Sequence, residues 1–136
     1  MGIHSASDTE YDWSWYGRLV GAYFDSHPPV QPGLVRSTTR SHPSTSAIPM
    51  AISRTDEWYN FRDDPSARGA TILLLLDETS YTGGTMGIFH PISWFQVYDG
   101  GRSWYTAMGH TDQSWSEIAF LEHVAGGIRW AAGAAQ

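Results

Sequence analysis

Aliphatic residues fill five consecutive positions in the middle of the chain, Ile72 to Leu76, within ATILLLLDE. A strand that is apolar at every position is covered on both faces, as in the middle of an α/β sheet. Further along, the runs HPISWFQVY and RSWYTAMGH flank Asp99-Gly100-Gly101, which is a strong β-hairpin signal. The pattern therefore predicts a buried strand followed by a hairpin.

Residues 12–25 carry apolar side chains at helical spacing and predict a helix with one buried stripe, formed by Trp13, Tyr16, Val20, Tyr23 and Phe24. Ser7 and Glu10 have the spacing of a capping box, which would start this helix as early as Asp8. Residues 26–55 hold five of the seven prolines and predict an irregular excursion with a short extended piece near 33–37.

A second helix is predicted at the C-terminus, where Ser114 and Glu117 form another capping box. Its buried stripe would consist of Ile118, Leu121, Ala125, Ile128 and Ala132. The pair Gly126-Gly127 would weaken or kink this helix, because each glycine costs about 1 kcal/mol relative to alanine. The predicted order of elements is therefore helix, long loop, buried strand, hairpin and helix.

The length of 136 residues suits one domain, which we expect to span residues 1–136. A net charge of −6 disfavours nucleic acid and anionic membranes as partners. The lack of cysteine excludes disulfides, thiolate metal sites and a cysteine nucleophile. The sequence contains no signal region and no membrane-length apolar stretch, so we expect a soluble chain, cytoplasmic rather than secreted as it stands.

Two of the six histidines, His4 and His110, fall at the ends of predicted strands. Ligands of parallel sheets bind at the carboxyl edge of the strands, so both imidazoles could face one cleft. There they could act as a general acid/base pair or hold a divalent metal such as zinc. The alternative, which spacing does not exclude, is that each caps a turn. His27 and His90 precede prolines and could either point into a cleft or serve as turn residues.

Carboxylates near these positions are the other candidates. Glu57 with Tyr59 is the pair that we favour for ligand contact, because a carboxylate beside aromatic rings suits sugar hydroxyls. Asp8 lies just beyond His4, and the carboxylate of Asp112 could fix the tautomer of His110.

Ordered blocks of the chain resemble the ThuA-like (trehalose utilisation) family, from Gly2 almost to Gly133. The blocks are GIHSASDTE, HPST, DEWYNF, LLLLDE, HPISW and GGRSWYTAMGHT. The resemblance implies kinship with class I glutamine amidotransferases and a flavodoxin-like three-layer α/β sandwich. It also implies that an N-terminal part of the sheet is missing, which would leave apolar faces bare and favour a homodimer.

In the amidotransferases, a sharp turn after a strand carries the nucleophilic cysteine, and His4 occupies that place here. The resemblance also aligns His110 with the relatives' catalytic histidine and Asp112 with its acidic partner. Glutamine hydrolysis needs the thiolate, so amidotransferase activity is not expected.

These observations lead to one functional expectation and two alternatives. The first is action on, or binding of, a sugar derivative in a histidine-lined cleft, with His4 and His110 catalytic. Its ligand contacts would come from Asp8, His27, Glu57, Tyr59, His90 and Asp112. The alternatives are a non-catalytic carbohydrate-binding module and an inactive fragment of a larger ThuA-domain protein.

Overall fold

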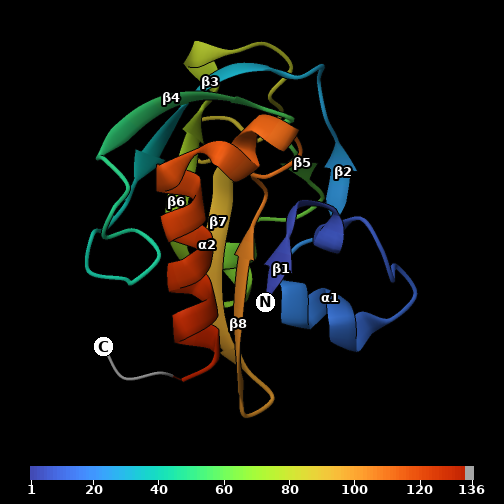
Figure 1. The fold of residues 1–136 in the computed structure, drawn as a ribbon. Helices are drawn as coiled ribbons and strands as arrows, with labels where there is room; N and C mark the ends of the chain where they lie inside the picture. The colour runs from blue at the N-terminus through green and yellow to red at the C-terminus, as the bar shows by residue number, and fades with distance from the viewer. Residues whose placement is uncertain (134–136) are drawn as a thin grey trace.

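The computed structural model describes residues 1–133 and is built on a curled six-stranded sheet (Figure 1). The strand order in this sheet is β1-β8-β7-β6-β3-β4, and β2 and β5 form a separate two-stranded sheet. The strands are β1 Gly2–Ile3, β2 Phe24–Ser26, β3 Gln31–Ser37, β4 Ala51–Asp56, β5 Asn60–Phe61, β6 Thr71–Asp77, β7 Pro91–Tyr98 and β8 Gly101–Thr106. The helices are α1 Ser14–Val20 and α2 Ile118–Ala131, with short 3-10 turns η1 His4–Ser7, η2 Pro65–Arg68, η3 Glu78–Ser80 and η4 Asp112–Ser116.

Strand direction decides which loops meet at each edge of the large sheet. The strand β1 pairs in parallel with β8, and each of the other neighbouring pairs is antiparallel. It follows that β1, β8, β6 and β4 all run the same way and end at one edge. The residues that follow these four strands are therefore brought to the same side of the molecule.

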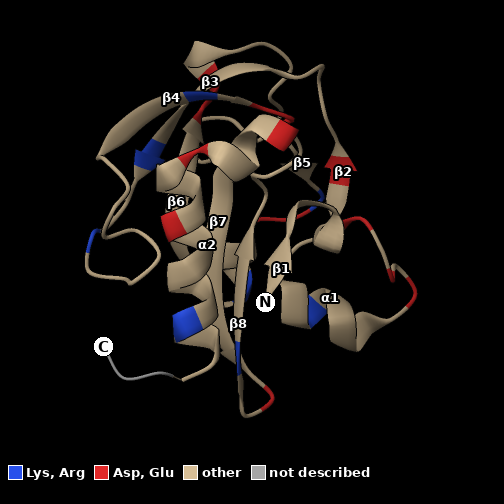
Figure 2. Ribbon diagram, in the orientation of Figure 1, with Lys and Arg blue, Asp and Glu red and all other residues tan. Residues whose placement is uncertain are grey.

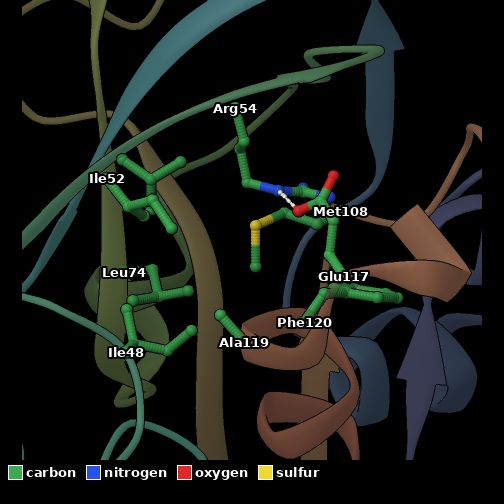
Figure 3. Close-up of a pocket in the computed structure, with 9 residues that line it drawn as sticks. Ile48, Ile52, Arg54, Leu74, Met108, Glu117, Ala119 and Phe120 are labelled. Atoms are coloured by element: carbon green, nitrogen blue, oxygen red, sulfur yellow. Dashed lines mark hydrogen bonds and ion pairs between the residues drawn. The ribbon is translucent and has the colours of Figure 1, made fainter. Parts of the chain in front are cut away.

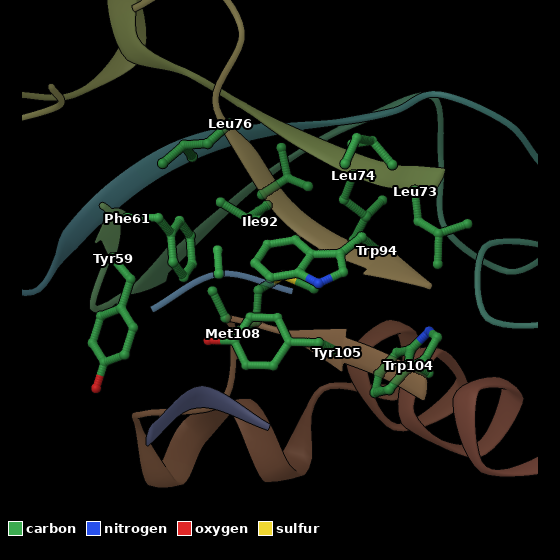
Figure 4. Close-up of a cluster of buried hydrophobic side chains, with 14 of the residues drawn as sticks. Tyr59, Phe61, Leu73, Leu74, Leu76, Ile92, Trp94, Trp104, Tyr105 and Met108 are labelled. Atoms are coloured by element: carbon green, nitrogen blue, oxygen red, sulfur yellow. The ribbon is translucent and has the colours of Figure 1, made fainter. Parts of the chain in front are cut away.

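The central strand and the hairpin are confirmed. In β6, Ile72, Leu73, Leu74 and Leu76 are buried, and the strand lies between β7 and β3. The hairpin consists of β7 and β8, which pair from Ser93 with Thr106 to Tyr98 with Gly101. Aromatic side chains from these strands pack on the leucines of β6 in the buried core (Figure 4).

The two helices cover opposite faces of the hairpin. On one face Trp94 donates a hydrogen bond to the carbonyl of Val20, so α1 packs there. On the other face the neighbouring residue Ser93 contacts His123 of α2. Because successive side chains of a strand point to opposite faces, the helices and the sheet form three layers. This mixed α/β architecture is consistent with the expected flavodoxin-like sandwich.

The N-terminal helix is shorter than the sequence pattern predicts. It begins at Ser14 and ends at Val20, and Phe24 belongs to a strand instead. The predicted capping box does not form, because the Ser7 hydroxyl bonds to Tyr105 and the carbonyl of His4. The extended piece predicted near 33–37 is part of β3, and the proline-rich stretch contains more order than expected, since most of β4 also lies within it.

The predicted C-terminal helix forms, but it begins only at Ile118 and turns a different face to the core. The capping box of Ser114 and Glu117 does not form, because the Glu117 amide donates to the Ser114 carbonyl oxygen and the Glu117 carboxylate bonds to Arg54. Its buried residues are Phe120, His123, Val124, Gly126 and Gly127, whereas Ile118, Leu121 and Ile128 are exposed. The helix continues through the two glycines, which allow close packing: a Cβ on Gly126 would lie 2.3 Å from the carbonyl oxygen of Pro43. The buried stripe expected for this helix was therefore wrong. The homodimer expected from the resemblance stays a prediction.

The positive charges of the protein do not gather on one element. Arginines are spread over several separate elements, including α1, β3, β4, β8 and α2 (Figure 2). Within residues 1–133, neither helix has the length and apolar character that crossing a bilayer requires.

Candidate functional site

Three candidate residues follow three strands that end at the same edge of the sheet. His4 follows β1, Glu57 follows β4, and His110 lies four residues after the end of β8. The strands β1 and β4 are the two outer strands of the sheet, so its curl is what brings Glu57 next to the two histidines. The expectation that His4 and His110 meet at a carboxyl edge agrees with this placement.

The side chains of these residues, which we call the His4–Glu57–His110 cluster, converge on one point. Nε2 of His4 lies 3.1 Å from Oε2 of Glu57 and 3.1 Å from Nδ1 of His110. The distance from Nδ1 of His110 to the same oxygen of Glu57 is 3.2 Å. His4 is buried, and the side chain of His110 is 44% exposed, so solvent reaches the cluster from the His110 side.

The backbone of His4 is strained. Its φ is 46°, a left-handed conformation that non-glycine residues rarely adopt. Strained residues of this kind cluster at functional sites, where the surrounding structure holds them. Here the turn from β1 into η1 places the imidazole at the edge of the sheet where β1 ends.

The tautomer of His4 follows from its hydrogen bonds. Its Nδ1 lies 2.7 Å from the carbonyl oxygen of Ala107, which can only accept, so Nδ1 carries a proton. In a neutral ring, Nε2 then presents a lone pair to a carboxylate oxygen of Glu57. Two lone pairs at 3.1 Å repel each other unless a positive charge lies between them. The cluster is therefore suited either to share a proton or to bind a cation.

His27 holds the other oxygen of Glu57. Its Nδ1 lies 3.0 Å from the carbonyl oxygen of Pro28, so this nitrogen carries a proton, and it lies 3.2 Å from Oε1 of Glu57. One carboxylate oxygen thus faces His27 while the other faces His4 and His110. The His27 side chain is 41% exposed.

Tyr59 forms an aromatic wall beside the cluster. The centroid of its ring lies 4.1 Å from that of His4 and 4.4 Å from that of Phe24. Burial raises the pKa of Tyr59, and the negative charges of Glu57 and Asp8 raise it further, so the phenol stays protonated. Its hydroxyl can therefore donate a hydrogen bond near the site.

Two other predicted contacts lie elsewhere, whereas the charge of Asp8 acts on Tyr59 beside the cluster. His90 is fully buried, with Nε2 bonded to the carbonyl of Tyr59 and Nδ1 2.8 Å from Glu78, so both ring nitrogens are occupied by protein groups. Asp112 opens η4 and, among the hydrogen bonds of residues 1–133, makes none to His110, whose Nδ1 faces Glu57 instead. Asp8 is exposed at the end of η1 and accepts a hydrogen bond from Tyr11. We therefore leave His90 and Asp112 out of the site.

Asp56 is a residue that sequence reasoning missed. It is fully buried and accepts hydrogen bonds from the backbone amides of Glu57, Gly109 and His110. Its position directly before Glu57 is the one feature of the sequence that places it near the site. The sequence does not reveal that it contacts a loop more than fifty residues away.

The donor set fits a divalent metal. Two imidazole nitrogens and a carboxylate oxygen are typical zinc ligands, and the three donor atoms lie within 4.8 Å of one another. Metal-binding histidines usually donate their second ring nitrogen to a carbonyl or carboxylate, as His4 does to Ala107. A larger hollow, of about 560 Å³, lies beside β6 and is lined by residues outside the cluster, among them Leu75, Thr79 and Ile88.

Comparison with protein families decides where this chain belongs. A model of the ThuA family, described as trehalose utilisation, matches residues 1–131. The chain belongs to the ThuA family. A search of curated proteins found no match to this ThuA protein.

Solved structures share the fold of this ThuA protein. A ThuA-like protein from Bacteroides uniformis ATCC 8492 superposes with a TM-score of 0.75 and 26% identity, over 96% of this chain and 56% of that one. One from Parabacteroides merdae ATCC 43184 gives a TM-score of 0.71 and 16% identity, over 98% of this chain and 60% of that one. A β-galactosidase from Bacillus circulans sp. alkalophilus matches with a TM-score of 0.54 and 12% identity, over 88% of this chain and 15% of that one. The chain thus spans less than two thirds of the two ThuA-like structures.

Proposed function

We propose that this ThuA protein binds a sugar derivative and acts on it at the His4–Glu57–His110 cluster, with a divalent metal ion such as zinc held by the three side chains. The observation that carries the proposal is the meeting of Nε2 of His4, Oε2 of Glu57 and Nδ1 of His110, each 3.1 to 3.2 Å from the others. Lone pairs aimed at one point favour a cation there. The family's description, trehalose utilisation, supports a sugar as the ligand.

The neighbouring side chains have distinct tasks in this proposal. A bound divalent ion would polarise a carbonyl or hydroxyl oxygen of the sugar. Tyr59, protonated and beside His4, would donate a hydrogen bond to a ligand oxygen. His27 would hold Glu57 in place through its contact with Oε1 at 3.2 Å. His4 and His110 supply the acid and base if the site works without a metal.

The experiment measures binding of trehalose and its oxidised derivatives by saturation-transfer NMR, with and without added zinc. We expect a signal for the wild-type chain that is lost in the double variant His4→Ala/His110→Ala. Glu122→Gln, on the exposed face of α2, is the matched control and should bind like the wild type. Equal binding by the double variant would remove the proposed function.

A second candidate function, non-catalytic carbohydrate binding, is favoured by a separate group of aromatic residues. Trp13 is 51% exposed and stacks on Trp15 and Tyr16, with ring centroids 5.3 and 5.9 Å apart. Exposed tryptophan and tyrosine rings supply large amphipathic contact surfaces. In this case Trp13→Ala would abolish sugar binding, whereas the double histidine variant would retain it.

A further inference from the structure

Asp56 links the two segments that bring Glu57 and His110 together. Its Oδ1 accepts hydrogen bonds from the amides of Glu57 and His110, both at 3.0 Å. Its Oδ2 accepts from the amide of Gly109 at 2.8 Å and from Arg54 at 2.6 Å. The same carboxylate thus fixes the end of β4, one outer strand of the large sheet, and the loop after β8, the strand next to the other outer strand.

The position of Asp56 is itself fixed from the other side by Arg54. This guanidinium also bonds to Glu117 at 3.0 Å and to Ser114 at 2.8 Å, which ties the network to η4 and the start of α2. Figure 3 shows the bond from Arg54 to Glu117, two of the residues that line a cavity of about 10 Å³, which has room for at most one water molecule. Because Asp56 is completely buried, a ligand does not reach it.

We propose that Asp56 is a positioning residue, whose carboxylate holds Glu57 and His110 at the spacing that the cluster needs for binding its ligand. The claim that this spacing serves ligand binding rests on the proposed function. The claim that Asp56 holds Glu57 and His110 in place does not. A general stabilising role explains the ion pair with Arg54 but not why three of the accepted hydrogen bonds come from backbone amides at the site. Buried ion pairs are also weak evidence for stability by themselves.

Replacement of Asp56 by asparagine separates these roles. Asparagine has the same shape but only one acceptor oxygen, and its NH2 group cannot accept from an amide. The oxygen is expected to face Arg54 and Gly109, because the guanidinium is charged. The NH2 group would then face the amides of Glu57 and His110, which pushes both segments away.

The test uses Co²⁺, whose visible absorption spectrum reports on the geometry of its ligands. Metal-free wild-type protein and Asp56→Asn are titrated with Co²⁺ at a temperature well below unfolding. We expect the dissociation constant to rise about 10- to 100-fold in the variant, with altered absorption bands. Asp77→Asn is the matched control, because Asp77 also ends a strand at this edge and accepts bonds from Thr79 and Arg36, but does not contact the cluster. It should stay within about twofold of the wild type.

A second measurement needs no metal. The rings of His4 and His110 have centroids 5.0 Å apart, so their protons should give a nuclear Overhauser cross-peak in the wild type and in Asp77→Asn. Its loss in Asp56→Asn, together with faster exchange of the His110 amide proton, is the expected result. If Asp56→Asn does not fold, Arg54→Lys loosens the carboxylate while keeping it, and the cross-peak should weaken.

The outcomes separate the two claims. If the wild type does not bind Co²⁺, the metal in the proposed function fails, and the inference about Asp56 is judged by the cross-peak and the amide exchange. A folded variant that keeps the cross-peak, the exchange rate and the Co²⁺ affinity of the wild type would overturn the inference.

Discussion

Nε2 of His4 lies 3.1 Å from Nδ1 of His110, although the two residues are 106 positions apart in the sequence. The parallel pairing of β1 with β8 accounts for this contact, because each histidine follows one of these two strands. Glu57 completes the cluster from the far end of the sheet. The relationship links the fold directly to the chemistry that we propose.

His27 supports the cluster through Glu57, and its removal should weaken the site without destroying it. In His27→Ala, Oε1 of Glu57 loses its partner at 3.2 Å, so the carboxylate gains freedom to rotate. Residues that orient metal ligands typically contribute 10- to 100-fold to affinity. We expect zinc affinity, measured by competition with a chromogenic chelator, to fall about tenfold. A drop as large as that of His4→Ala would instead make His27 a direct ligand.

Acid should destabilise the protein through its buried histidines. Burial lowers the pKa of His123 to about 4, from 6.5 in the unfolded chain. Between these values the unfolded chain binds a proton that the folded chain does not, so stability falls as the pH falls from 6.5 to 4. At about 1.4 kcal/mol per pKa unit, His123 alone accounts for roughly 3 kcal/mol. Burial lowers the pKa of His42 to about 4 as well, so this residue adds to the loss of stability in acid.

Urea unfolding at pH 7 and pH 5 measures this acid effect. His123→Gln should be less stable than the wild type at pH 7 but should show a weaker dependence on pH. An unchanged pH dependence in His123→Gln would assign the acid sensitivity to other groups.

The glycines of α2 are expected to resist replacement by alanine. A Cβ on Gly126 would lie 2.3 Å from the carbonyl oxygen of Pro43, a backbone atom that cannot move aside cheaply. The overpacking should cost about 1–3 kcal/mol and outweigh the gain of about 1 kcal/mol in helix propensity. Thermal unfolding of Gly126→Ala measures the difference. Gly101→Ala is the control, because its Cβ would meet only the carbonyl oxygen of Tyr98, at 3.5 Å.

Truncation of a side chain should destabilise the protein on the buried face of α2 but not on the exposed face. Phe120 is 1% exposed, so Phe120→Ala should lower the free energy of unfolding by about 3–5 kcal/mol. Ile118 is 79% exposed, so Ile118→Ala should change it by less than about 0.5 kcal/mol. Urea unfolding midpoints of the two variants, compared with that of the wild type, measure these changes. A large loss in Ile118→Ala would mean that this face is covered in solution.

The elements with strong local patterns could be predicted from the sequence. Local sequence alone indicates the buried strand in the aliphatic run of β6 and the turn at Asp99-Gly100-Gly101 between β7 and β8. The positions of His4 and His110 after strands were also visible. These features depend on short segments, in which side-chain periodicity and turn chemistry decide the backbone.

Features set by packing between distant segments could not be predicted. The strand β4 lies in a proline-rich stretch and forms because β3 pairs with it. The sequence of α2 offers two faces that could be buried. The face with Phe120, His123 and Gly127 is the buried one, because it packs against Trp104 and residues 43–44. Glu57 reaches the histidines only through the curl of the whole sheet.

The most direct test of the central claim is calorimetric titration of chelator-treated protein with zinc. We expect one tightly bound ion per chain for the wild type, and an affinity at least 100-fold lower for His4→Ala and for His110→Ala. Zinc binding that is absent from the wild type, or equal in the wild type and both variants, would contradict it.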